Sequence, residues 1–116
     1  MKNLFLLLIF LFSTLQLSAT KELSVEEKTL NAILNDNFEY VEFVLHEKLI
    51  KSTACIYGKP LIIHAAIHNK AEMILLLANY RAMLYNPVCE EGKDIMDYAI
   101  ENNAIHAQAQ IIIIRA

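Results

Sequence analysis

The chain has little glycine, proline or cysteine, with two residues of each among 116, and it contains no tryptophan. These scarcities exclude a collagen-like chain, a linker rich in glycine and proline, and a miniprotein held together by many disulfides. Ten Lys and Arg stand against thirteen Asp and Glu, and no basic block could neutralise a row of phosphates, so nucleic acid is not an expected partner. Apolar residues are abundant at 56%, in a length that allows one domain.

The first twenty residues have the order of an export signal. Lys2 is their only charge, and residues 4–12 are continuously apolar. The small or polar residues Ser13, Thr14, Gln16, Ser18 and Ala19 follow. The apolar run is shorter than the roughly 20 residues needed to span a bilayer, which favours a cleaved signal peptide over a retained anchor. We expect residues 1–19 to be removed, which leaves residues 20–116 as one domain in the periplasm or outside the cell.

A repeat with a period of about 33 residues organises the remaining chain. Residues 58–66, with the sequence GKPLIIHAA, are echoed 34 residues later by GKDIMDYAI at 92–100, and a weaker third copy lies around Ala32. Each copy has two apolar stretches at helical spacing, separated by a polar break, so each unit is predicted to consist of two short helices. One unit has too little core to be stable alone, and the units are therefore expected to stack.

These residues resemble the ankyrin repeat, in which a turn Gly precedes Thr-Pro-Leu-His, a pair of Ala and a second helix rich in Leu. The resemblance implies an all-α, ankyrin-like solenoid of about three helix-turn-helix units, at approximately 22–54, 55–88 and 89–116. Arg81 departs from the family pattern because it stands where a Gly normally ends the second helix. The residues that take structural positions of the family are Gly58, Ala65, Ala66, Gly92 and Ala99.

The two ends of the array are predicted to differ. Ser24 and Glu27 form a capping-box pattern that starts a helix at Val25, and charged residues around them suit a terminal unit. At the other end, the run of four Ile at 111–114 would indicate a strand by itself, but its register places it in the second helix of the third unit. Four consecutive helical residues cannot all face one neighbour, so at least one Ile must point outwards. The exposed Ile could mean only that the last unit is incompletely capped, or it could form a surface that docks on a partner. The sequence leaves both interpretations open.

Catalytic and metal chemistry find little support in the sequence. His64 and His68 are spaced to share a helix face, but no third ligand is evident, and the repeat register turns His64 inwards and His68 outwards. Two Gly cannot build a phosphate-binding loop, and no base is positioned to activate a Cys. We therefore expect no enzyme activity, no cofactor and no metal.

Cys55 and Cys89 occupy equivalent positions in successive units. Stacked helical units are on the order of 10 Å apart, whereas a disulfide requires Cα atoms within about 7 Å. Export favours disulfide formation, and an additional residue near Pro87 could bring the two positions closer. The sequence leaves the bond open.

The resemblance implies a surface that binds another protein. Ankyrin repeats grip partners with the turn fingers and the exposed side of the first helix, which in the middle unit correspond to Ile56, Tyr57, Lys59, Ile67 and His68. In the last unit they correspond to Glu90, Glu91, Lys93, Glu101 and Asn102. The first set has the composition of an anchor, with Tyr57 as the strongest candidate, and the second that of a charged rim.

The leading prediction is a non-enzymatic protein–protein interaction module that binds one protein partner in the periplasm or outside the cell. An immunity protein or inhibitor is one form of such a module. The alternative is a self-assembling structural or envelope-associated protein that docks through its C-terminal end, at Ile111, Ile112, Ile113 and Ile114.

Overall fold

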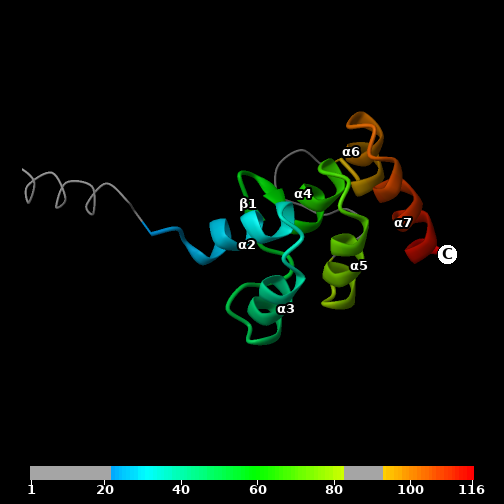
Figure 1. Cartoon of the computed structure of the whole chain (residues 1–116). Helices are drawn as coiled ribbons and strands as arrows, with labels where there is room; N and C mark the ends of the chain where they lie inside the picture. The colour runs from blue at the N-terminus through cyan, green and yellow to red at the C-terminus, as the bar shows by residue number, and fades with distance from the viewer. Residues whose placement is uncertain (1–21, 83–92) are drawn as a thin grey trace, which may run out of the picture.

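A computed structural model describes residues 22–82 and 93–116. The signal-peptide prediction for residues 1–19 and the positions of Glu90, Glu91 and Gly92 lie outside these residues. The described chain is mostly helical, as predicted, and a β-hairpin of two-residue strands is added to it (Figure 1). In chain order the elements are α2 (Val25–Leu34), α3 (Phe38–His46), β1 (Cys55–Ile56), β2 (Lys59–Pro60), α4 (Leu61–Ile67), α5 (Ala71–Asn79), α6 (Ile95–Glu101) and α7 (Ile105–Arg115).

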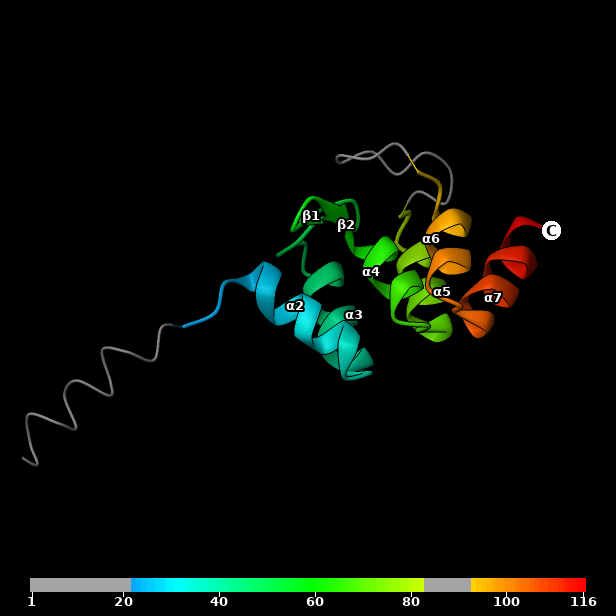
Figure 2. The ribbon, with the colours of Figure 1, turned by 90° about the horizontal axis from the view of Figure 1, so that it is seen from above.

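The helices form three consecutive pairs: α2 with α3, α4 with α5, and α6 with α7. The first helices of neighbouring pairs contact each other, α2 against α4 and α4 against α6, and α5 also packs against α7. Figure 2 shows the pairs side by side in chain order, with the hairpin beside α4. Among the described residues, no helix is long and apolar enough to cross a membrane.

The same turn joins the two helices of every pair. A residue with positive φ follows the first helix, and the amide after it donates a hydrogen bond to the carbonyl of an alanine inside that helix. The positive-φ residues are Asp36, Asn69 and Asn103, at 57°, 59° and 53°. The accepting alanines are Ala32, Ala65 and Ala99, at 2.8, 2.8 and 2.9 Å. The turns are 33 and 34 residues apart, so the spacing found in the sequence recurs in the backbone.

A second turn of this kind ends α3 and α5. Lys48 and Arg81 have φ of 59° and 68°, and the following amides donate to the carbonyls of Val44 and Leu77. Such a left-handed residue commonly terminates a helix and is usually a Gly, since a side chain there costs roughly 1–2 kcal/mol. The left-handed terminator is therefore retained at Arg81, at the cost of backbone strain in that residue.

Side chains also fix where the helices begin. Ser24 accepts a hydrogen bond from the Glu27 amide at 3.2 Å, and α2 begins at Val25, as the sequence predicted. A complete capping box opens α6, where Asp94 caps the helix and its amide donates to Asp97 at 3.1 Å. Sequence reasoning missed this capping box. At Ser24, the structure shows only the half of the predicted box in which Ser24 accepts from the Glu27 amide.

The core lies between the helices of each pair and between successive pairs. Its largest fully buried side chains come from all three pairs and include Ile33, Val41, Leu61, Ile62, Ile63, Ile74, Leu77, Ile95 and Ile111. The Ile run belongs to α7, as its register predicted, with Ile111 buried and Ile112 and Ile113 exposed. Ala65, Ala66 and Ala99 are fully buried.

Candidate interaction surface

The hairpin β1–β2 presents Tyr57 at its tip. The strands pair antiparallel, with Cys55 opposite Pro60 and Ile56 opposite Lys59. Tyr57 and Gly58 form the two-residue turn with φ of 53° and 75°, the signs required by a type I′ turn. The Tyr57 side chain is 73% exposed, so the ring projects into solvent rather than covering the turn.

Ile56 does not belong to this surface, contrary to the prediction. Its side chain is only 6% exposed and packs in the hydrophobic core. Successive residues of a strand point to opposite sides, and because Cys55 faces outwards, Ile56 faces the core. Of the two predicted anchor residues at the hairpin, only Tyr57 is therefore exposed for a partner.

His64 ties the hairpin to α4. Its imidazole is buried, and Nε2 lies 2.7 Å from the Ile56 carbonyl oxygen. A carbonyl only accepts, so Nε2 carries the proton and donates it. Burial lowers the pKa of His64; the hydrogen bond to Ile56 opposes this, and the positive charge of Lys59 adds to the lowering. The histidine therefore serves as a neutral clamp.

His68, in contrast, is exposed just beyond the end of α4. The two histidines diverge, as the repeat register predicted. In residues 22–82 and 93–116, no cluster of three or more metal-binding side chains occurs.

Cys55 supplies a second constraint on the hairpin because it is disulfide-bonded. The only other cysteine of the sequence is Cys89, which lies outside the described residues. The estimate from regular helix spacing, which counted against a bond, is therefore wrong for Cys55. The hairpin thus carries a disulfide at its first residue, and the His64 hydrogen bond ties its second residue to α4.

The other candidate residues of the middle unit are distributed along α4. Lys59, half-buried, precedes the helix, whereas Ile67, also half-buried, and His68 stand at its end. A seven-residue helix is about 10 Å long, so Tyr57 and Lys59 form one group and Ile67 and His68 another.

The candidates of the third pair lie on and around α6. Lys93 Nζ contacts Glu101 Oε1 at 3.0 Å and lies 5.7 Å from the centre of the Tyr98 ring. Asn102 donates from its side chain to the Tyr98 carbonyl at 2.8 Å. A pocket of about 360 Å³ is lined by Lys93, Asp97, Ile100 and Glu101. The structure thus brings Lys93, Glu101 and Asn102 together around α6.

Polar contacts between the pairs gather at the turns, and sequence reasoning missed them. Lys70 forms an ion pair with Asp36 at 3.1 Å, and Asn69 Oδ1 accepts from the Ala107 amide at 2.9 Å. A pocket of about 440 Å³ is lined here by Asp36, Phe38, Asn69, Lys70, Ala71, Glu72 and His106. The repeated polar break in the sequence was the available signal.

Comparison with known proteins adds no relative: no protein-family model, curated protein or solved structure matches the chain.

Proposed function

We propose that this protein is an exported, ankyrin-like stack of three helix pairs that binds a protein partner and carries out no chemistry of its own. The recurrent turns at 33 and 34 residues and the contacts of each pair with the next support the stack. The order of residues 1–19 supports export. An immunity protein or inhibitor in the periplasm or outside the cell fits this description.

The observation that carries the proposal is the exposed aromatic ring of Tyr57 on a fixed hairpin. Rigid aromatic side chains are enriched among the residues that dominate binding energy. The hydrogen bond between His64 and Ile56 ties the hairpin to α4 before any partner binds. Less conformational entropy is then lost on binding. Lys93, Glu101 and Asn102 would provide a polar rim.

A substitution can delete the ring without opening the turn. Asn-Gly is the preferred pair for a turn with two positive φ angles, so Tyr57→Asn preserves or strengthens the hairpin. If Tyr57 is the anchor, this variant should bind the partner at least about tenfold more weakly, the effect typical of a dominant contact residue. The partner would be obtained by affinity capture from the exporting compartment, and binding by both proteins would then be compared by titration.

Leu49→Asn is the matched control because it also removes an exposed large apolar side chain, in this case outside the hairpin. We expect Leu49→Asn to bind like the wild type. Equal affinity of wild type and Tyr57→Asn would eliminate the hairpin as the binding site. Export is tested separately, by N-terminal sequencing of the protein from that compartment, which should begin at Thr20.

A further inference from the structure

The first helix pair has an end face that no other pair covers in the described structure. Lys28 and Asn31 on α2 are exposed, whereas the residues one period later, Leu61 and His64, are buried. On α3, Phe43 is 53% exposed. We call Lys28, Asn31, Tyr40 and Phe43 the N-terminal face.

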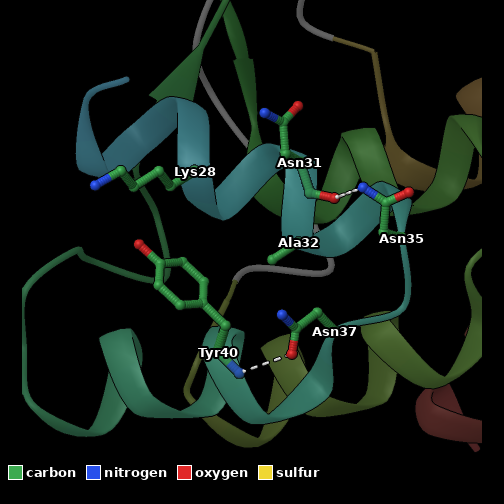
Figure 3. A pocket seen from close by; sticks show the side chains of 6 residues that line it. All are labelled: Lys28, Asn31, Ala32, Asn35, Asn37 and Tyr40. Atoms are coloured by element: carbon green, nitrogen blue, oxygen red, sulfur yellow. Dashed lines mark hydrogen bonds between the residues drawn. The ribbon is translucent and has the colours of Figure 1, made fainter. Parts of the chain in front are cut away.

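This face is hollowed between its two helices. A pocket of about 270 Å³ is lined by Lys28, Asn31, Ala32, Asn35, Asn37 and Tyr40. Figure 3 shows the Lys28 and Tyr40 side chains reaching from α2 and α3 along the two sides of this hollow. On the N-terminal face, the aromatic side chains of α3 therefore lie beside the part of α2 that carries the Lys28 ammonium group.

The third pair has the opposite end face. Asp97 and Ile100 on α6 are exposed, whereas Ile63 and Ala66, one period earlier, are buried. On α7, Ile105 is exposed and Ile112 is 60% exposed, and their spacing of seven residues places them on one side of the helix. We call Asp97, Ile100, Ile105 and Ile112 the C-terminal face.

The two faces are complementary when they are brought together as neighbouring pairs are within the chain. That arrangement sets α2 of one copy against α6 of another, as α4 is set against α6. It also sets α3 against α7, in the place that α5 takes against α7 within the chain. Lys28 then approaches the Asp97 carboxylate, and Phe43 and Tyr40 approach the exposed Ile residues of α7. Apolar side chains meet on the half formed by α3 and α7. On the other half, Lys28, which pairs with Glu22 at 3.4 Å within its own chain, can also reach Asp97.

We infer that these faces bind each other, so that a second copy of this chain stacks head to tail on the first and continues the internal packing. Self-association of α7 with α7 of another copy is disfavoured because it would bring the exposed Asp97 carboxylates of two α6 helices near each other. A head-to-tail contact leaves one free face at each end, so assembly continues beyond the dimer unless the copies close into a ring. The hairpin is not involved, and Tyr57→Asn should assemble like the wild type.

Two variants separate the faces. Ile112→Glu blocks the C-terminal face and Phe43→Glu blocks the N-terminal face, and both original side chains are exposed, so the fold should tolerate the charge. Leu75→Glu is the matched control, since it places the same charge at an exposed position of the middle pair. Far-UV circular dichroism verifies that each full-length variant is folded.

Sedimentation velocity at about 10–200 μM measures the assembly. We expect concentration-dependent oligomers for wild type and Leu75→Glu, and at least tenfold weaker association for each face variant alone. An equimolar mixture of Ile112→Glu and Phe43→Glu should form a heterodimer and nothing larger, because one intact pair of faces remains. A monomeric wild type would overturn the inference. So would a Phe43→Glu variant that still dimerises by itself, or a mixture in which no heterodimer forms.

Discussion

Asn69 joins two neighbouring helix pairs through a contact that can be measured in isolation. It lies in the turn between α4 and α5 with φ of 59°, and its side-chain oxygen accepts from the amide of Ala107, in the first turn of α7. Ala104, the residue that precedes α7, provides no side-chain cap. Asn69 therefore caps a helix of the next pair from 38 residues away.

Asn69 caps α7 and also occupies a positive-φ position in its own turn. Substitution by glycine separates these two contributions to stability. Asn69→Gly removes the cap, which is typically worth about 1 kcal/mol, and it also relieves the strain of a side chain at positive φ. Asn103→Gly relieves the same strain, because Asn103 occupies the equivalent turn with φ of 53°. The free energy of unfolding of Asn69→Gly should therefore lie about 1 kcal/mol below that of Asn103→Gly.

Urea denaturation followed by circular dichroism measures this difference. In a domain of this size, 1 kcal/mol corresponds to roughly 4–8 °C in Tm, so thermal scans provide a second readout. Asn69→Asp retains the accepting oxygen and should remain close to wild type. Indistinguishable stabilities of Asn69→Gly and Asn103→Gly would refute the cap.

Three further outcomes are expected. Arg81→Gly should raise the free energy of unfolding by about 1 kcal/mol in urea denaturation, because it relieves a left-handed side chain, and a destabilised variant would contradict this. Burial lowers the pKa of His64 below the ordinary 6.5, so the unfolded chain binds the proton more readily, and stability should fall as the pH drops below about 6.5. His64→Gln should remove this loss in thermal scans between about pH 7 and pH 5, whereas His68→Gln should retain it. Cys55→Ser should lower the free energy of unfolding by about 2–4 kcal/mol, and an equal effect of a reducing agent on wild type would link that loss to the disulfide.

Local signals and the register of the repeat together predict the helices. Ser24 marks the start of α2 because a capping side chain acts within four residues, and the apolar spacing of each stretch reflects one helix face. The Ile run was assigned correctly only through its register, since β-branched residues alone would have indicated a strand. The inward turn of His64 also followed from register.

Features that depend on contacts distant in sequence were not predictable in this way. The spacing argument for Cys55 assumes regular helix pairs, whereas Cys55 lies in a hairpin outside the helices. The family register predicts an exposed Ile56, but it does not specify which side chain of a two-residue strand faces the core. The cap from Asn69 to Ala107 has no local signature. The capping box of Asp94 and Asp97, in contrast, has a local signature, because its two residues are three positions apart.

The scarcity of glycine has a structural consequence in these turns. Six described residues other than Gly have positive φ, and three of them, Asp36, Asn69 and Asn103, occupy the same turn of successive pairs. Gly would adopt the positive φ more easily. However, it could not form the ion pair that Asp36 forms with Lys70, and it could not cap α7 as the Asn69 side chain does. Asp and Asn tolerate the left-handed region at a modest cost. At Asp36 and Asn69, a strained backbone conformation is thus combined with polar contacts between the pairs.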